Sequence, residues 1–235
     1  MATNPAENDG VSAMQHAISA VNDRLTSRRD FLTKGTAAGV VLLGMGGSAV
    51  GTAGAQEEDE DAPTDVDVLN FALTLEHLED VFYRRGVEQF CSTDFERCKT
   101  LNGFSARVRK DVYNNIVDIG DHESTHTEVL TQVITDLGGD PVPELEYEFG
   151  FETPEEFLAI AQVLENTGVS AYDGAINKIE NKELVTAGAT IATVEARHAS
   201  YLNLLNGADP FPAAFDEAKS KDEILEAAGG FIVQE

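Results

Sequence analysis

One stretch of the chain, residues 112–137, carries the pattern that decides the fold: VYNNIVDIGDHESTHTEVLTQVITDL. Its core-facing positions step alternately by four and by three, which places them on one face of a helix that packs in a bundle. The positions on this face are Val112, Ile116, Ile119, Glu123, His126, Leu130, Val133 and Leu137. Two of them are polar, Glu123 and His126. Because a buried carboxylate is costly without a partner, this pair indicates a site with chemistry.

Three further helical patterns accompany this one, which we place over residues 104–137. The others cover about 66–88, a segment that starts at Thr153 and Pro154 as cap and first position, and about 182–206. No segment resembles a strand, and only the link at 138–153 is long enough to cross a bundle. The sequence therefore predicts an all-α, four-helix bundle with one long crossover between helices two and three, followed by a short C-terminal helix over 213–228.

Composition divides the chain into four segments. Residues 1–55 form a predicted export signal, 56–65 an acidic linker, 66–208 the bundle and 209–235 a C-terminal extension. In the first segment, SRRDFL at 27–32 precedes an apolar, glycine-rich run at 35–50 and the small residues AGA at 53–55. Paired arginines, a weak apolar run and a small-x-small site are typical of a twin-arginine signal. We expect export by the twin-arginine translocase to the cell surface or the extracellular space.

The charge of the chain limits its partners. Asp and Glu number 42 against 16 Lys and Arg, for a formal net charge of −26. Such a chain is repelled by nucleic acid and by anionic membranes, so neither is an expected partner. A strongly hydrated acidic surface also suits high salt, and a halophilic source is expected.

Two cysteines enclose the segment CSTDFERC, at Cys91 and Cys98. In an exported protein, a disulfide is the default expectation for such a pair. Closing so small a loop would contribute about 2–3 kcal/mol. A metal-binding pair is the alternative, but neither Cys nor His lies nearby in the sequence.

The polar core positions form an internal repeat. The first half places Glu76 seven residues before Tyr83 and then has Glu123-x-x-His126. The second half repeats the order with Glu165 seven residues before Tyr172 and then Glu195-x-x-His198. Seven residues are two helical turns, so each tyrosine shares a face with its glutamate.

This set of residues fits a centre of two metal ions. Four buried carboxylates demand cations, and two divalent ions neutralise them. One histidine nitrogen for each ion, together with terminal and bridging carboxylates, suits iron or manganese. We expect Tyr83 and Tyr172 to donate hydrogen bonds to the glutamates of the opposite helix.

The pattern resembles the ferritin and rubrerythrin superfamily, over about residues 66–206. The wording LNFALTLEHLEDVFY at 69–83 and VEARHASYLNLL at 194–205 is similar to an exported, desiccation-related branch, which points to a haloarchaeon. The resemblance implies redox chemistry on Fe(II), peroxide or oxygen in stress protection, and a possible homo-oligomer. The ligands it implies are Glu76, Glu123, His126, Glu165, Glu195 and His198. The chain lacks paired Cys-x-x-Cys motifs, which leaves the electron donor open.

Several alternatives remain at this point. Glu79 lies near the face of Glu76 and could replace or supplement it, although the repeat places Gly168 at the matching position. His77 adjoins Glu76 and is expected to be a surface or supporting residue. HESTH at 122–126 is also a zinc protease signature, with His122 and His126 as ligands and Glu123 as general base. Finally, the bundle could be a structural or stress-protective protein whose metal only stabilises the fold.

Replacing both Arg28 and Arg29 by lysine should trap the precursor inside the cell, because the translocase recognises the arginine pair. The wild-type mature protein should begin at or near Gln56. Fractionation and N-terminal sequencing of both forms test this expectation, and normal export of the double variant would contradict it.

Overall fold

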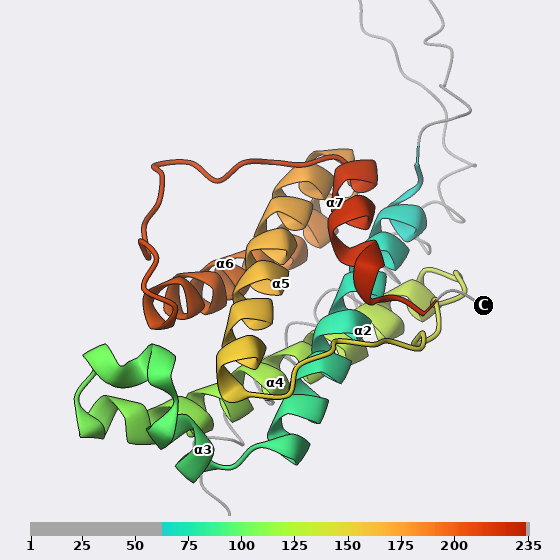
Figure 1. Cartoon of the computed structure of the whole chain (residues 1–235). Helices are drawn as coiled ribbons and strands as arrows, with labels where there is room; N and C mark the ends of the chain where they lie inside the picture. The colour runs from blue at the N-terminus through green and yellow to red at the C-terminus, as the bar shows by residue number, and fades with distance from the viewer. Residues whose placement is uncertain (1–62, 234–235) are drawn as a thin grey trace, which may run out of the picture. The chain divides into compact units, whose positions relative to one another are not determined.

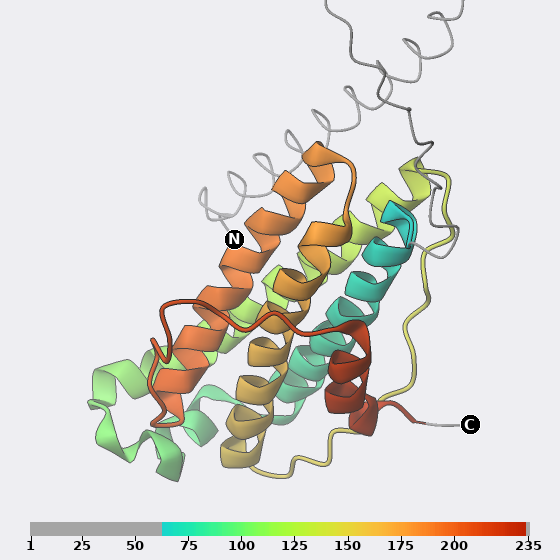
Figure 2. The same ribbon diagram turned by 90° about the horizontal axis from the view of Figure 1, so that it is seen from above.

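Four long helices form the bundle in this computed structural model, which describes residues 63–233. They are α2 (Asp65–Gln89), α4 (Ala106–Asp136), α5 (Pro154–Ala175) and α6 (Lys182–Leu205). Helix α2 runs antiparallel to α4, and α5 runs antiparallel to α6, so that α4 and α5 point the same way (Figure 1, Figure 2). The long crossover at 138–153 makes this parallel relation possible. The predicted all-α bundle with this connectivity is confirmed.

Local capping signals fix where the helices begin. Thr153 accepts a hydrogen bond from the backbone N–H of Glu156, and Pro154 occupies the first turn, as the sequence predicted. Thr64 forms the same type of capping box with Asp67 at the start of α2. Helix α6 is followed by Gly207, whose φ of +76° favours glycine. These signals account for starts and ends that lie within two residues of those expected from the sequence.

Side chains of α2 hold the crossover in place. Val142 and Asp140 each hydrogen-bond through their backbone to Asn70, at 2.8 and 3.1 Å. Farther along the helix, Nε2 of His77 lies 3.1 Å from the carbonyl oxygen of Val142, and Arg85 donates to the carbonyl of Tyr147 at 2.6 Å. The crossover is therefore bound along much of α2. The role of His77 is to contact this segment.

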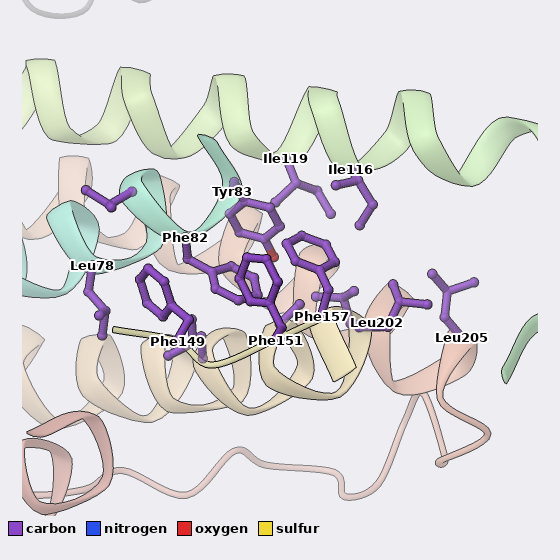
Figure 3. Close-up of a cluster of buried hydrophobic side chains, with 14 of the residues drawn as sticks. Leu78, Phe82, Tyr83, Ile116, Ile119, Phe149, Phe151, Phe157, Leu202 and Leu205 are labelled. Carbon is purple, nitrogen blue, oxygen red and sulfur yellow. The ribbon is translucent and has the colours of Figure 1, made fainter. Parts of the chain in front are cut away.

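The apolar core consists of two clusters, one toward each end of the bundle. One is rich in aromatic rings, and Figure 3 shows its centre. Its members include Phe82, Tyr83, Ile116, Ile119, Phe149, Phe151, Phe157, Leu202 and Leu205. The other cluster is mostly aliphatic, with Leu69, Ala72, Leu73, Leu130, Val133, Ile134, Tyr172, Leu184 and Ile191. Along α4 and α6, the polar core residues of the repeat lie between the members of one cluster and those of the other.

The expected C-terminal helix is shorter than predicted. Helix α7 spans Lys221–Ala228, and residues 213–220 are not helical. The start is set by Ser220, which forms a capping box with Glu223. Phe215 in the preceding segment is 90% exposed, so this stretch buries no apolar face that could stabilise a helix.

The expected disulfide is not formed in this structure, where Cys91 and Cys98 are free thiols. Between them lies a six-residue helix that the sequence reading missed, α3 (Ser92–Arg97), followed by the 3₁₀ turn η1 (Lys99–Gly103). At about 1.5 Å rise per residue, this helix separates its ends by roughly 9 Å. A disulfide needs Cα atoms about 4.4–6.8 Å apart.

Two short 3₁₀ segments complete the secondary structure, η2 (Ile176–Lys178) and η3 (Gly229–Phe231). Within residues 63–233, β pairing is limited to an isolated antiparallel bridge between Tyr147 and Ile232. None of the helices in this part of the chain is long and apolar enough to cross a membrane. The predicted export signal and most of the acidic linker lie outside the described residues.

Gly86 should resist substitution, because Phe157 occupies the space where a side chain would begin. A Cβ at Gly86 would lie 2.1 Å from Cε2 of Phe157, whose ring stacks on Phe82 with centroids 4.6 Å apart. We expect Gly86→Ala to lower the free energy of unfolding by about 1–3 kcal/mol through overpacking.

The control is Gly188→Ala on α6, where a Cβ meets nothing within 4 Å. That change should be neutral or stabilise by about 0.5–1 kcal/mol, since alanine is the better helix former. Urea unfolding of both variants measures the difference, and equal effects would contradict the close packing of Phe157 on α2.

Candidate metal centre

All six predicted ligands meet in the middle of the bundle. Each of the four long helices contributes: α2 and α5 supply one glutamate each, and α4 and α6 supply a glutamate and a histidine one turn apart. The side chains are Glu76, Glu123, His126, Glu165, Glu195 and His198. The four glutamates are completely buried, and the two histidines are at most 5% exposed. So dense a group of buried polar side chains requires a compensating charge.

The ligand atoms form two groups that share members. One group is Glu76, Glu123, His126 and Glu195, and the other is Glu123, Glu165, Glu195 and His198. Within each group the atoms lie within 4.8 Å of one another. Glu123 and Glu195 belong to both groups, whereas each remaining glutamate and each histidine belongs to one. Each group could hold a metal ion, and the two groups overlap at Glu123 and Glu195.

The distances between the histidine nitrogens and the carboxylates are those expected for ligands that share an ion. Nδ1 of His126 lies 3.3 Å from Glu76, 3.0 Å from Glu123 and 3.1 Å from Glu195. Nδ1 of His198 lies 2.9 Å from Glu123 and 3.2 Å from Glu165. Two donors that each lie about 2.0–2.2 Å from one ion are themselves roughly 3.0–3.5 Å apart. Both histidines therefore present Nδ1 at suitable positions.

Several of these atoms have no hydrogen bond despite complete burial. They are Oε2 of Glu76, Oε1 of Glu123, Oε2 of Glu165, both carboxylate oxygens of Glu195 and Nδ1 of His198. Nδ1 of His198 and Oε1 of Glu123 are close, yet their angles do not make a hydrogen bond. Buried oxygen and nitrogen atoms without hydrogen-bond partners, gathered from four helices, fit a bound cation.

Two tyrosines support the terminal glutamates from the opposite helix. Tyr83 on α2 donates to Oε1 of Glu165 on α5, at 2.5 Å, and Tyr172 on α5 donates to Oε1 of Glu76 on α2. These crosswise hydrogen bonds are the ones expected from the repeat. Each leaves the second oxygen of its glutamate directed into the centre.

Glu79 is a fifth buried carboxylate beside the centre, which sequence reasoning had set aside. Its side chain is 3% exposed. A Cβ at Gly168 would lie 3.2 Å from Oε1 of Glu79 and 3.4 Å from Oε2 of Glu195. Glu79 therefore occupies the room that Gly168 leaves. Gly168 has no side chain, and this was the sequence signal that could have placed the Glu79 carboxylate beside the centre.

His122 lies next to the centre but belongs to neither group of candidate ligands. Its Nδ1 is 3.0 Å from Nε2 of His198, the outer nitrogen of that ring. His126 instead faces the three glutamates of its own group. Within residues 63–233, His122 and His126 do not combine into a zinc site, and Glu123 lies between the two candidate ligand histidines rather than free as a base.

The centre perturbs the proton affinity of its members. Burial, followed by the charge of a neighbouring glutamate, raises the pKa of Glu123 to about 7 and that of Glu195 to about 8. Burial opposes protonation of His198, but the adjacent carboxylates of Glu123 and Glu165 outweigh it and raise the pKa of His198 to about 10. The pKa of Glu76 is lowered, since His126 and Tyr172 outweigh the effect of burial.

The remaining shifts have the same origin. Burial and the charges of the other glutamates raise the pKa of Glu79 well above its usual range. Burial and the adjacent carboxylates also raise the pKa values of both tyrosines, which stay protonated as donors. In the absence of cations the centre therefore retains protons, and cations must displace them.

The metal-free protein should lose stability as the pH rises from about 5 to 8. The folded-state pKa values of Glu123, Glu195 and His198 lie above their ordinary values of 4.5, 4.5 and 6.5. The stability that these groups contribute is present below the unfolded-state values and is lost as the pH rises through the folded-state values. The lowered pKa of Glu76 acts in the opposite direction but is a single group.

Urea unfolding at pH 5, 6.5 and 8, with and without metal, measures this trend. With metal bound the carboxylates are held unprotonated, so the loss at high pH should vanish. A metal-free protein that gains stability from pH 5 to 8 would contradict the burial of these carboxylates.

Comparison with known proteins matches the part of the chain that builds the centre. Protein rds1 of Schizosaccharomyces pombe is 25% identical over 188 residues, which cover 77% of this chain and 44% of that protein. The chain thus spans less than half the length of that relative. The family described as "Ferritin-like domain" matches residues 64–208, which include all four long helices and all six candidate ligands. By this match over most of its length, the chain belongs to the ferritin-like domain family.

Proposed function

We propose that this protein binds two divalent ions, iron or manganese, and uses them in redox chemistry. The observation that carries the proposal is the sharing of Glu123 and Glu195 by two overlapping groups of buried ligands. A single ion would leave one terminal glutamate and one histidine unused. With two ions, one would be held by Glu76 and His126 and the other by Glu165 and His198, and both groups would include Glu123 and Glu195.

The donor set supports iron or manganese over other metals. Each position offers carboxylate oxygens and one imidazole nitrogen and no sulfur, which suits hard to borderline ions. A pair of such ions supplies one- or two-electron chemistry with Fe(II), peroxide or oxygen as substrate. The chain holds the terminal glutamates in place through the two tyrosines and keeps bulk water away by burial.

The setting of this chemistry is part of the same proposal. The arginine pair and the apolar run at the start of the chain support export by the twin-arginine translocase. The net charge of −26 supports a high-salt environment and a haloarchaeal source. An exported two-metal centre of this type would serve in protection against stress from metals or oxidants.

A second function is favoured by the enclosure of the centre. The six ligands are at most 5% exposed, and the two apolar clusters lie toward either end of the bundle. Such a site could serve to hold four helices together in a stress-protective protein without turnover. Both functions need the same ions, and they differ in whether added Fe(II) or peroxide is consumed.

Metal content should distinguish the bridging ligands from the terminal ones. The wild-type protein, produced without a tag or chelator, should contain about two iron or manganese ions per chain. Glu123→Gln should lose both ions because it alters a shared ligand, whereas Glu165→Gln should retain one. Glu128→Gln, at an exposed position on the same helix as Glu123, is the control.

Elemental analysis of the wild type and the three variants measures their metal content. Assays of Fe(II) oxidation and peroxide consumption then test for activity. A wild-type chain that holds no metal or a single zinc ion, with thermal unfolding unchanged by chelator, would overturn the two-metal centre. Two bound ions without consumption of Fe(II) or peroxide would favour the structural function.

A further inference from the structure

His122 contacts the outer edge of a candidate ligand. It lies exposed on α4, directly before Glu123 in the sequence, and its Nδ1 is 3.0 Å from Nε2 of the buried His198 on α6. The two ring planes differ by only 10°, with centroids 5.2 Å apart. The centroid separation exceeds the distance between the nitrogens by about two ring radii, so the rings meet edge to edge in nearly one plane. That is the geometry of a direct hydrogen bond between ring nitrogens.

We propose that His122 is a positioning residue for His198: it accepts the Nε2 proton of that ring and so presents Nδ1, unprotonated, to the metal position at Glu165. The inference rests on the proposed two-metal centre. A neutral imidazole carries one ring proton, and a nitrogen that binds metal cannot carry it. Nδ1 of His198 is the nitrogen that faces Glu123 and Glu165. The proton must then lie on Nε2, where Nδ1 of His122 accepts it.

The second half of the repeat lacks this device. The residue before Glu195 is Val194, which offers no acceptor. No described residue hydrogen-bonds to the outer nitrogen of His126, whose Nδ1 faces three glutamates. The two metal positions thus share the same types of ligand but differ in how their histidines are held. His122, which the zinc protease signature would make a metal ligand, thus has a supporting role beside a ligand histidine.

The consequence is an affinity difference confined to one position. Partners that fix the orientation of a ligand histidine typically contribute about 10- to 100-fold to metal affinity. His122→Leu should therefore weaken one of the two dissociation constants by about that factor and leave the other within about threefold. His122→Asn keeps an acceptor oxygen near the position of Nδ1 and should restore much of the loss.

Stepwise titration of the metal-free protein with Co(II) measures the two constants in the wild type and in both variants. The control is His77→Asn, since His77 also adjoins a ligand glutamate but its ring contacts the carbonyl of Val142 in the crossover. It should leave both constants unchanged. Thermal unfolding of each metal-free variant separates a binding defect from a folding defect.

Nitrogen-15 NMR of the zinc-loaded protein gives a readout independent of affinity. The chain has five histidines, so the ring signals can be assigned by single substitutions. In the wild type, His198 should carry its proton on Nε2, with the proton protected from exchange by the hydrogen bond. In His122→Leu, that protection should be lost.

The outcomes separate the two proposals. A wild type that binds fewer than two ions refutes the two-metal centre itself. A wild type with two ions whose constants are unchanged in His122→Leu, with the proton on Nε2 still protected, refutes the positioning role alone. Equal weakening at both positions also refutes it, because His122 contacts one ligand histidine and not the other.

Discussion

The burial of four carboxylates at one level of a helical bundle is the constraint on which the other features depend. A group of like charges in an apolar interior is unstable without protons or cations. The neighbouring structure is arranged accordingly. Two histidines place nitrogen among the carboxylates, and two tyrosines each satisfy one oxygen of a terminal glutamate. The oxygens that remain unsatisfied belong to the two overlapping groups of candidate ligands, so the packing of the four helices and the candidate metal centre depend on the same residues.

The repeat gives the centre its symmetry, while departures from the repeat make its two sides different. Glu76 and Glu165, with their tyrosines, exchange hydrogen bonds across the bundle in a nearly equivalent way. Glu79 has no counterpart, since Gly168 occupies the matching position and leaves room for its carboxylate. His122 likewise has no counterpart at Val194. The aromatic cluster lies on one side and an aliphatic cluster on the other. The two groups of candidate ligands therefore have different surroundings.

The long helices and their candidate ligands could be predicted because the helical spacing of the apolar residues and the positions of the polar residues indicate the same face. In α4 the spacing of Val112, Ile116, Ile119 and Leu130 defines a face, and Glu123 and His126 lie on it. The connectivity followed from one long link, and the start of α5 from a capping box. In such cases a local signal and a tertiary requirement point to the same structure.

Features that depend on a single tertiary contact could not be predicted in this way. The segment between Cys91 and Cys98 is too short for a periodic pattern, so its helix went unseen and a disulfide was expected instead. Residues 213–220 contain good helix formers, but they find no apolar surface to cover. The roles of Glu79 and His122 depend on residues more than 70 positions away in the sequence, Gly168 and His198. Spacing along one helix cannot reveal which neighbour fills a gap on another.

The electrostatics of the centre also bear on where assembly would take place. Without cations, the raised pKa values of Glu123 and Glu195 mean that the folded chain holds protons near neutral pH and is weakened as they leave. Binding of the two divalent ions proposed above would replace those protons and couple metal loading to folding stability. The twin-arginine route proposed here carries proteins that are already folded. A chain loaded with metal in the cytoplasm would enter that route in its most stable form, and the cell rather than the outside medium would then select the metal. The export signal and the buried carboxylates would in that case answer the same requirement, that metal binding precede export.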